Sequence, residues 1–301
     1  MNIPETLPQD TPLDASWLAE CVDRTLSEDL GGDPGRDVTT QATIDAAATV
    51  TGHVVAREAG VLAGLDVIDE ALRNTAARLR LDVPTVSHQS ADGDRVEAGQ
   101  IVATIQGVGH VVLIAERTIL NLVTRASGIA TATRAWADAL SGTGTRVLDT
   151  RKTTPQLRPL EKYAVRMGGG VNKRMGLYDV AMIKDNHVVA AGGVAPAIAA
   201  IRETFPDVHI QVEVERIEQA REAIEAGARF LLLDNMSNGD MAALVDVVRA
   251  GEAATGKVWL EATGGLTLTR APSVAQTGVD FMSVGALTHS SPGLDLALDL
   301  V

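Results

Sequence analysis

The sequence concentrates positive charge in one short stretch. Between Asp149 and Arg174 it carries seven lysines and arginines against two acidic residues, although the formal net charge of the whole chain is −13. Four of the five lysines in the chain fall within the 33 residues from Lys152 to Lys184. Fixed cations bind carboxylates and phosphates, and arginine does so through two parallel hydrogen bonds. The stretch therefore predicts a binding site for an anionic ligand.

The seven cations differ in what precedes them. Arg151 and Lys152 directly follow the apolar run RVLD, at the end of an expected strand, and this position favours a functional role. Lys173 and Arg174 follow three glycines, whose backbone freedom suits the close approach of a ligand. The other three cations repeat every four residues, which is typical of a solvent-exposed helix face. These are Arg158, Lys162 and Arg166.

Carboxylates and glycines form a second group of candidates. Glu213 and Glu215 alternate along one expected strand and so share a face, and Asp234 ends the next strand. Carboxylates without His or Cys neighbours suit Mg²⁺, which prefers oxygen ligands shared with substrate phosphates. Asp234 has an alternative interpretation as the cap of the following helix. Residues 263–265 and 283–285 end the last two strands, where backbone N–H groups often bind a phosphate. The residues alone predict a phosphorylated substrate, Mg²⁺ and a second, polyanionic substrate.

From residue 144 onward, short apolar runs alternate with alanine-rich helical segments. Six runs end on polar or glycine residues: RVLDTRK, DVAMIKDNH, VHIQVEVE, RFLLLDN, KVWLEATGG and VDFMSVGA. Strands that alternate with helices form a parallel sheet, and in an α/β barrel the carboxyl ends of all strands meet at the face that holds the active site. A complete barrel of eight units takes about 250 residues, whereas roughly 150 remain here. We therefore expect a reduced barrel of about six units.

The preceding residues have the pattern of an α+β domain. Residues 14–30 and 65–81 favour helices, while TVTGHVVAREAGVLAGL and DGDRVEAGQIVATIQGVGH favour strands and turns. A long helix is expected over residues 112–140, with Gly128 as a point of bending or interruption. We expect an N-terminal domain over residues 1–115 and a barrel over residues 116–289. The tail, residues 290–301, either follows the barrel or joins the N-terminal domain.

Composition excludes several classes of function. Aromatic residues make up only 3% of the chain, which together with the acidic net charge argues against binding to nucleic acid or anionic membranes. Cys21 is the single cysteine, which excludes an internal disulfide and a thiolate zinc site. The first residues show no signal peptide, and no apolar run approaches the ~20 residues that cross a bilayer. The segment DGDRVEAGQIVATIQGVGH resembles biotinyl and lipoyl carrier domains, which attach their cofactor to a lysine. This function is also excluded, because no lysine precedes Lys152. We expect a cytoplasmic protein.

The stretch DTRKTTPQLRPLEKYAVRMGGGVNKRMGLYDVAMIKDNH closely resembles the quinolinate phosphoribosyltransferases. The resemblance covers nearly the whole chain and includes EDLGGDPGRDVTT, AERTILNLVTRASGIATAT, EVE, LLLDN, EATGGL and SVGALTHS. It implies an N-terminal α/β sandwich followed by an open, reduced α/β barrel of the type II phosphoribosyltransferase kind, in a homodimer or larger oligomer. It also implies that quinolinate and 5-phosphoribosyl 1-pyrophosphate react, with Mg²⁺, to give nicotinate mononucleotide, pyrophosphate and CO₂ for de novo NAD biosynthesis.

The resemblance assigns roles to individual residues. Lys152, Glu213 and Asp234 are implied to be catalytic, with Glu213 and Asp234 near Mg²⁺ and the ribose. Arg117 in AERT corresponds to an arginine that reaches quinolinate across the dimer interface. The implied substrate-binding residues, including two phosphate loops, are Arg117, Thr150, Arg151, Lys152, Lys173, Arg174, Lys184, Glu213, Asp234, Thr263, Gly264, Gly265, Val284, Gly285 and Ala286.

Two positions depart from the family pattern. Lys173 stands where the family usually has histidine, and Thr263 stands where it often has serine. Thr263 keeps the hydroxyl group, and Lys173 keeps a hydrogen-bond donor that is expected to hold a substrate carboxylate. The change at Lys173 leaves open a related substrate, such as nicotinate or another pyridine carboxylate.

Two functions of other classes are also considered. A barrel enzyme that forms a Schiff base would use Lys152 or Lys184 as the amine, but such an enzyme needs one lysine rather than a group of cations. A basic patch that binds nucleic acid conflicts with the acidic net charge. His187 in KDNH is interpreted as a hydrogen-bonded structural residue rather than a base.

Overall fold

The computed structural model describes residues 11–301 and divides into two compact units. The N-terminal unit comprises residues 11–134, 153–169 and 288–301, and the barrel unit comprises residues 135–152 and 170–287. The expectation that no export signal begins the chain concerns residues 1–10, which lie outside the described residues. Within residues 11–301, every helix is too short or too polar to serve as a membrane span.

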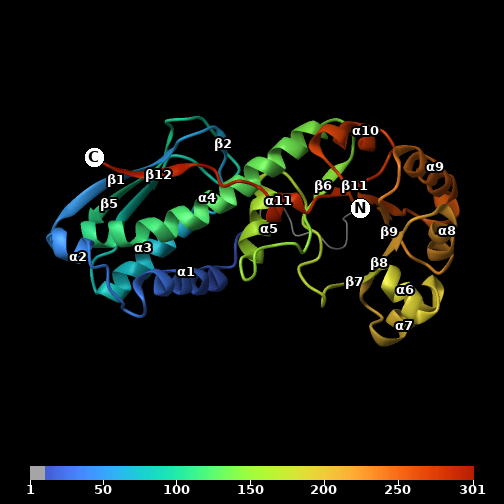
Figure 1. Cartoon of the computed structure of the whole chain (residues 1–301), viewed down its shortest axis with the longest axis horizontal. Helices are drawn as coiled ribbons and strands as arrows, with labels where there is room; N and C mark the ends of the chain where they lie inside the picture. The colour runs from blue at the N-terminus through green and yellow to red at the C-terminus, as the bar shows by residue number, and fades with distance from the viewer. Residues whose placement is uncertain (1–10) are drawn as a thin grey trace. The chain divides into compact units, whose positions relative to one another are not determined.

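A four-stranded antiparallel sheet forms the base of the N-terminal unit, in the order β12-β1-β5-β3. Its strands are β1 (Thr49–Ala56), β3 (Thr85–His88), β5 (Ile101–Val108) and β12 (Leu296–Leu300). Strands β2 (Gly60–Val61) and β4 (Arg95–Val96) form a separate short pair. The last strand of the chain thus pairs with the first, and the C-terminal segment completes the N-terminal sheet (Figure 1).

The helices of this unit are α1 (Ala15–Leu30), α2 (Thr40–Thr43), α3 (Asp66–Leu79), α4 (Gly109–Ala139) and α5 (Arg158–Met167). Helix α1 begins where the Asp14 carboxylate accepts the Trp17 N–H at 2.8 Å, and it ends at Gly31, whose φ of 73° is a left-handed conformation that glycine adopts easily. Helix α4 is continuous through Gly128. A Cβ atom at Gly128 would lie 2.0 Å from the Pro292 carbonyl oxygen, so this glycine permits the close passage of the C-terminal segment.

Helix α5 corrects one expectation. Lys162 and Arg166 are only 1% and 4% exposed, so the interpretation of their spacing as a solvent-exposed face is wrong. Buried charges require partners. The fully buried Glu161 accepts hydrogen bonds from Arg125 Nε at 3.0 Å and Nη2 at 2.9 Å, and the Arg166 guanidinium lies 5.4 Å from the centre of the Tyr163 ring.

The barrel unit contains six parallel strands, one for each apolar run in the sequence. They are β6 (Arg146–Leu148), β7 (Val180–Ile183), β8 (His209–Val214), β9 (Phe230–Asp234), β10 (Trp259–Thr263) and β11 (Phe281–Ser283). Their order is β6-β11-β10-β9-β8-β7, so the last strand pairs with the first and the sheet is open between β6 and β7. On the open side, Val171 forms a parallel bridge with Leu148. The prediction of a reduced, open α/β barrel is therefore confirmed.

The helices of the barrel unit follow its strands in the chain. They are α6 (Asp185–Ala191), α7 (Val194–Thr204), α8 (Ile217–Glu225), α9 (Asn238–Thr255), the 3₁₀ turn η1 (Leu268–Arg270), α10 (Ala271–Ala275) and α11 (Ala286–His289).

The inward side chains of the barrel change character along the strands. On β10, Trp259, Glu261 and Thr263 share one face because side chains alternate along a strand. Trp259 lies at the amino end of this series, where it packs on Phe281, with ring centres 5.5 Å apart. Phe230 stacks on the same Phe281 ring at 5.8 Å. From the amino to the carboxyl end of β10, the inward face thus passes from a cluster of aromatic rings, the aromatic base, through the buried carboxylate of Glu261 to the polar side chain of Thr263.

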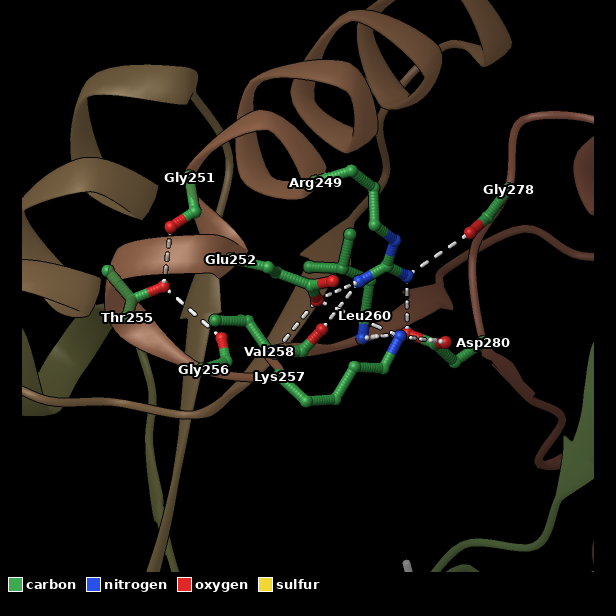
Figure 2. Close-up of polar contacts among 10 residues, drawn as sticks. All are labelled: Arg249, Gly251, Glu252, Thr255, Gly256, Lys257, Val258, Leu260, Gly278 and Asp280. Carbon is green, nitrogen blue, oxygen red and sulfur yellow. Dashed lines mark hydrogen bonds and ion pairs between the residues drawn. The ribbon is translucent and has the colours of Figure 1, made fainter.

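An ionic network joins the amino ends of β10 and β11 to the end of α9 (Figure 2). The Asp280 carboxylate accepts hydrogen bonds from Arg249 Nη2 at 2.7 Å, from Lys257 Nζ at 2.8 Å and from the Leu260 N–H at 2.8 Å. Glu252 accepts the Val258 N–H at 3.0 Å and a bond from Arg249 Nη1 at 2.7 Å. Residues at this end of a barrel serve stability rather than chemistry.

Along the chain, the N-terminal unit extends to residue 134, whereas the sequence suggests a boundary at residue 115. Helix α4 belongs to the N-terminal unit as far as residue 134, because the Ser127 and Thr131 hydroxyls accept hydrogen bonds from the Ala63 and Val61 N–H groups. Residues 153–169 belong there as well, since Glu161 pairs with Arg125 of α4. The β12–β1 pairing places the C-terminal segment in the same unit.

Candidate active site

A pocket of about 520 Å³ lies at the carboxyl ends of the barrel strands. This is the face on which α/β barrels carry their active sites. All residues that line it belong to the barrel unit. They are Thr150, Arg151, Lys152, Lys173, Arg174, Met182, Lys184, Glu213, Leu232, Asp234, Asn235, Thr263, Gly264 and Ser283.

The segment after β6 supplies the first two cations. Arg151 and Lys152 are exposed, and the Lys152 N–H donates to the Thr150 hydroxyl at 3.1 Å, which forms a tight turn at the strand end. The preceding Asp149 is fully buried and turns inward. The end of β6 therefore places a buried carboxylate beneath the barrel face and two cations at the pocket.

The bridge segment, residues 171–174, crosses the open side of the barrel. The Val171 N–H donates to the Val147 carbonyl at 2.9 Å, and Asp149 Oδ2 and Oδ1 accept bonds from Asn172 Nδ2 at 2.6 Å and from the Lys173 N–H at 2.8 Å. Arg174 Nη1 donates to the Val180 carbonyl at 2.8 Å. These contacts fix a segment that has no helix or ladder of its own.

Lys173 faces a buried carboxylate. Its Nζ donates to Glu261 Oε1 at 2.6 Å, with side chains that are 8% and 0% exposed. From the sequence, the Lys173 ammonium is expected to bind a substrate carboxylate. The structure shows that it also forms an ion pair with Glu261, which the sequence did not predict. Lys173 still lines the pocket.

Lys184 and Glu213 pair across the ends of β7 and β8. Lys184 Nζ donates to Glu213 Oε2 at 2.8 Å, and the lysine side chain is 48% exposed. The backbone N–H of Lys184 donates to His187 Nδ1 at 3.0 Å. The ring of His187 thus caps the start of α6, as expected of a hydrogen-bonded structural histidine.

Asp234 does not cap the following helix. The side chain of Ser237 accepts the Asp240 N–H and begins α9, so the capping interpretation of Asp234 is wrong. Asp234 Oδ2 instead accepts a bond from Asn235 Nδ2 at 2.8 Å at the pocket wall.

The donor set limits how Mg²⁺ can bind. Among residues 11–301 there is no group of three or more His, Cys, Asp or Glu side chains placed to hold a metal ion. Glu213 and Asp234 lie in one pocket, and Glu213 is engaged by Lys184. Two carboxylates fit an ion that arrives with substrate phosphates, because Mg²⁺ in phosphate sites takes only one or two carboxylates from the protein.

The two expected phosphate loops differ in geometry. Gly264 and Gly265 have positive φ angles of 85° and 57°, and a Cβ atom at Gly264 would lie 2.2 Å from Asn235 Oδ1. Glycine is therefore required after β10. In the second loop, the Val284 N–H donates to the Leu148 carbonyl at 2.9 Å, which continues the ladder between β11 and β6. That N–H group is therefore engaged within the sheet, and the expected role of the loop at Val284 stays a prediction.

Most of the predicted site residues meet in the pocket, but five do not line it: Arg117, Gly265, Val284, Gly285 and Ala286. Arg117 lies on α4 in the N-terminal unit, with a side chain that is 60% exposed. Sequence reasoning missed Met182 and Leu232, which line the pocket floor, and Glu261 behind Lys173. The period-two alternation of β9 and β10 marks Leu232 and Glu261 as inward residues and was the available signal.

A hollow of about 530 Å³ on the N-terminal unit is similar in size, but its lining residues have no charged side chains. They are Thr49, Val50, Thr51, Gln106, Gly107, Leu300 and Val301. The barrel pocket instead combines five cationic and two acidic side chains, so it is the one suited to polyanions.

Comparison with known proteins agrees with this geometry. The N-terminal domain model of quinolinate phosphoribosyl transferase matches residues 37–127, and the C-terminal domain model matches residues 129–299. The nicotinate-nucleotide pyrophosphorylase [carboxylating] of Mycobacterium leprae is 46% identical over 281 residues, which cover 93% of this chain and 96% of that protein. A protein of Bacillus subtilis with the same name, marked as probable, is 40% identical and covers 94% and 93%.

Solved structures match as well. The nicotinate-nucleotide pyrophosphorylase of Francisella tularensis superimposes with a TM-score of 0.86 at 34% identity, and the match covers 100% of both chains.

Proposed function

The chain belongs to the quinolinate phosphoribosyltransferase family, and we propose that it transfers the phosphoribosyl group of 5-phosphoribosyl 1-pyrophosphate to quinolinate with loss of CO₂. The products are nicotinate mononucleotide, pyrophosphate and CO₂. The enzyme is a pentosyltransferase of de novo NAD biosynthesis.

One observation carries this assignment: five cations and two carboxylates line a single pocket at the carboxyl face of an open barrel. Quinolinate has two carboxylates, and its co-substrate has a phosphate and a pyrophosphate. Two polyanions can share a pocket only where clustered cations offset their mutual repulsion. Arg151, Lys152, Lys173, Arg174 and Lys184 supply that charge.

The reaction needs positioning and electrostatic stabilisation rather than a covalent nucleophile. The pyridine nitrogen attacks C1 of the ribose as pyrophosphate leaves. The resulting pyridinium withdraws electrons from the adjacent ring carbon, whose carboxylate leaves as CO₂ and is replaced by a proton. Arg151, Lys152 and Arg174 hold anionic groups in place, and Glu213 and Asp234 stabilise the positive charge that develops on the ribose.

Mg²⁺ is proposed to enter with the pyrophosphate group and to lie against Glu213 and Asp234. When bound, it neutralises negative charge that develops on the leaving group. The two-carboxylate donor set supports this role, since it suits a metal carried by the substrate.

A homodimer or larger assembly in the cytoplasm is proposed, with Arg117 entering the pocket of a second copy. The support is that Arg117 is 60% exposed and contacts only its neighbour Glu116, at 3.8 Å, among the ion pairs of the described residues. Acceptance of nicotinate is not favoured, because the relatives that are 46% and 40% identical to this chain are named as carboxylating enzymes.

The test is a product assay. Purified protein is incubated with quinolinate, 5-phosphoribosyl 1-pyrophosphate and Mg²⁺, and nicotinate mononucleotide is quantified by chromatography. We expect product in the complete mixture and its loss when a chelator removes Mg²⁺. Absence of product under all Mg²⁺ concentrations would refute the assignment.

A further inference from the structure

Glu261 lies in the interior of the barrel, two residues before the pocket-lining Thr263 on β10. It occupies the middle of β10, between Trp259 of the aromatic base and Thr263 of the pocket wall, and all three share one face. Its neighbours in register are Leu232 on β9 and Phe281 on β11. A carboxylate at 0% exposure in such surroundings needs a specific reason.

The ion pair with Lys173 gives little stability to the fold. Burying two charges costs several kcal/mol, and the attraction between them offsets that cost only when the remaining hydrogen-bonding capacity is satisfied. Glu261 Oε1 accepts from Lys173 Nζ at 2.6 Å, but Oε2 has no hydrogen-bond partner among the described residues. An apolar pair of similar volume would serve the fold at least as well.

The same ion pair strongly constrains the pocket. Lys173 is attached at two points: its N–H to Asp149 Oδ1 at 2.8 Å and its Nζ to Glu261. The bridge segment follows three glycines, and the φ of Gly169 is 89°. Without Glu261, the buried Lys173 ammonium would lose the carboxylate that accepts its Nζ hydrogen bond at 2.6 Å, in a pocket that four other cations also line.

We propose that Glu261 is a positioning residue that holds the Lys173 ammonium at the wall of the pocket where a dicarboxylate binds. Glu261 itself does not contact the substrate, because Lys173 stands between it and the pocket. This inference rests on the proposed function, since it assigns the dicarboxylate to the Lys173 side of the pocket.

The experiment measures quinolinate binding by titration calorimetry, together with steady-state KM and kcat. Glu261→Gln keeps the shape of the side chain and removes its charge. For this variant we expect the dissociation constant and the KM for quinolinate to rise about tenfold or more, because the buried Lys173 ammonium has lost its charged partner. We expect kcat at saturation to change far less, because the lost interaction acts on binding.

A double-mutant cycle tests whether Glu261 acts through Lys173. Lys173→Met is compared with Lys173→Met/Glu261→Gln, and we expect equal dissociation constants because Lys173 is then absent. A further loss in the double variant would overturn the proposal. If Glu261→Gln does not fold, Lys173→Met/Glu261→Met replaces the whole pair; we expect a melting temperature at or above that of the native protein and binding equal to Lys173→Met.

Asp280→Asn is the matched control. It removes a carboxylate that pairs with two cations in the same barrel, at the opposite end of the strands (Figure 2). We expect lower stability with unchanged quinolinate affinity. Wild-type affinity in Glu261→Gln would overturn the inference alone. Binding of quinolinate without turnover by the native protein would overturn the proposed function alone, and absence of binding would overturn both.

Discussion

The Asp280 network offers a stability prediction whose size follows from its contacts. The Asp280 side chain is 16% exposed and accepts three hydrogen bonds, two of them from cations. In Asp280→Asn the amide NH₂ replaces one acceptor, so one charge-assisted bond is lost and the other is weakened. A hydrogen bond to a charged group contributes about 1.5–3 kcal/mol, and partial exposure of Arg249 and Lys257, each 27%, reduces this.

We therefore expect the variant to lose about 2–3 kcal/mol of unfolding free energy, which lowers the melting temperature by roughly 5 °C. The assay is thermal unfolding followed by circular dichroism at low and high salt, with Asp246→Asn as the control. Asp246 is exposed on α9, the helix that carries Arg249, so its replacement changes net charge equally without breaking the network. A melting temperature for Asp280→Asn within about 1 °C of that of Asp246→Asn would refute the reasoning.

Three further predictions concern the site and the N-terminal unit. Asp234→Asn should fold normally and lose most turnover, because a neutral amide is a weaker Mg²⁺ ligand; native activity across a Mg²⁺ titration would contradict this. Arg117→Ala and Arg151→Ala should each be inactive alone and recover activity when mixed, since one pocket of a mixed dimer is intact; failure despite verified subunit exchange would exclude the shared pocket. Burial and then the Asp92 carboxylate raise the pKa of Tyr163, whose hydroxyl donates to Asp92 Oδ2 at 2.6 Å. The protonated Tyr163 hydroxyl therefore stabilises the folded state fully below pH ~10, and this stabilisation is lost as pH rises above that value. Tyr163→Phe should therefore be less stable at neutral pH and should show a smaller alkaline loss than the native protein in denaturant titrations; parallel curves would contradict the assignment.

Local pattern was sufficient to predict the barrel. Each of the six apolar runs became a strand, because uninterrupted apolar segments such as residues 230–233 are typical of parallel strands covered on both faces. Parallel strands align their carboxyl ends, so the candidate site residues Arg151, Lys184 and Asp234 line one pocket although they are far apart in sequence.

Contacts between residues that are far apart in the sequence could not be predicted from local sequence pattern. The spacing of Lys162 and Arg166 fits an exposed helix face and equally a face that packs, and only tertiary structure distinguishes the two. Likewise, EATGG reads as a strand end, and nothing local indicates that Glu261 pairs with a lysine 88 residues earlier. The pairing of β12 with β1 brings together strands that are about 240 residues apart in the sequence, which periodicity does not determine.

The central claim is that the pocket joins quinolinate to a phosphoribosyl group and decarboxylates it. The most direct test supplies quinolinate labelled in its 2-carboxylate, with 5-phosphoribosyl 1-pyrophosphate and Mg²⁺, and measures labelled CO₂, pyrophosphate and nicotinate mononucleotide in the same samples. We expect the three products to appear in equal amounts and nicotinate to be a much poorer substrate. Formation of the mononucleotide from nicotinate, with no labelled CO₂ released from quinolinate, would contradict it.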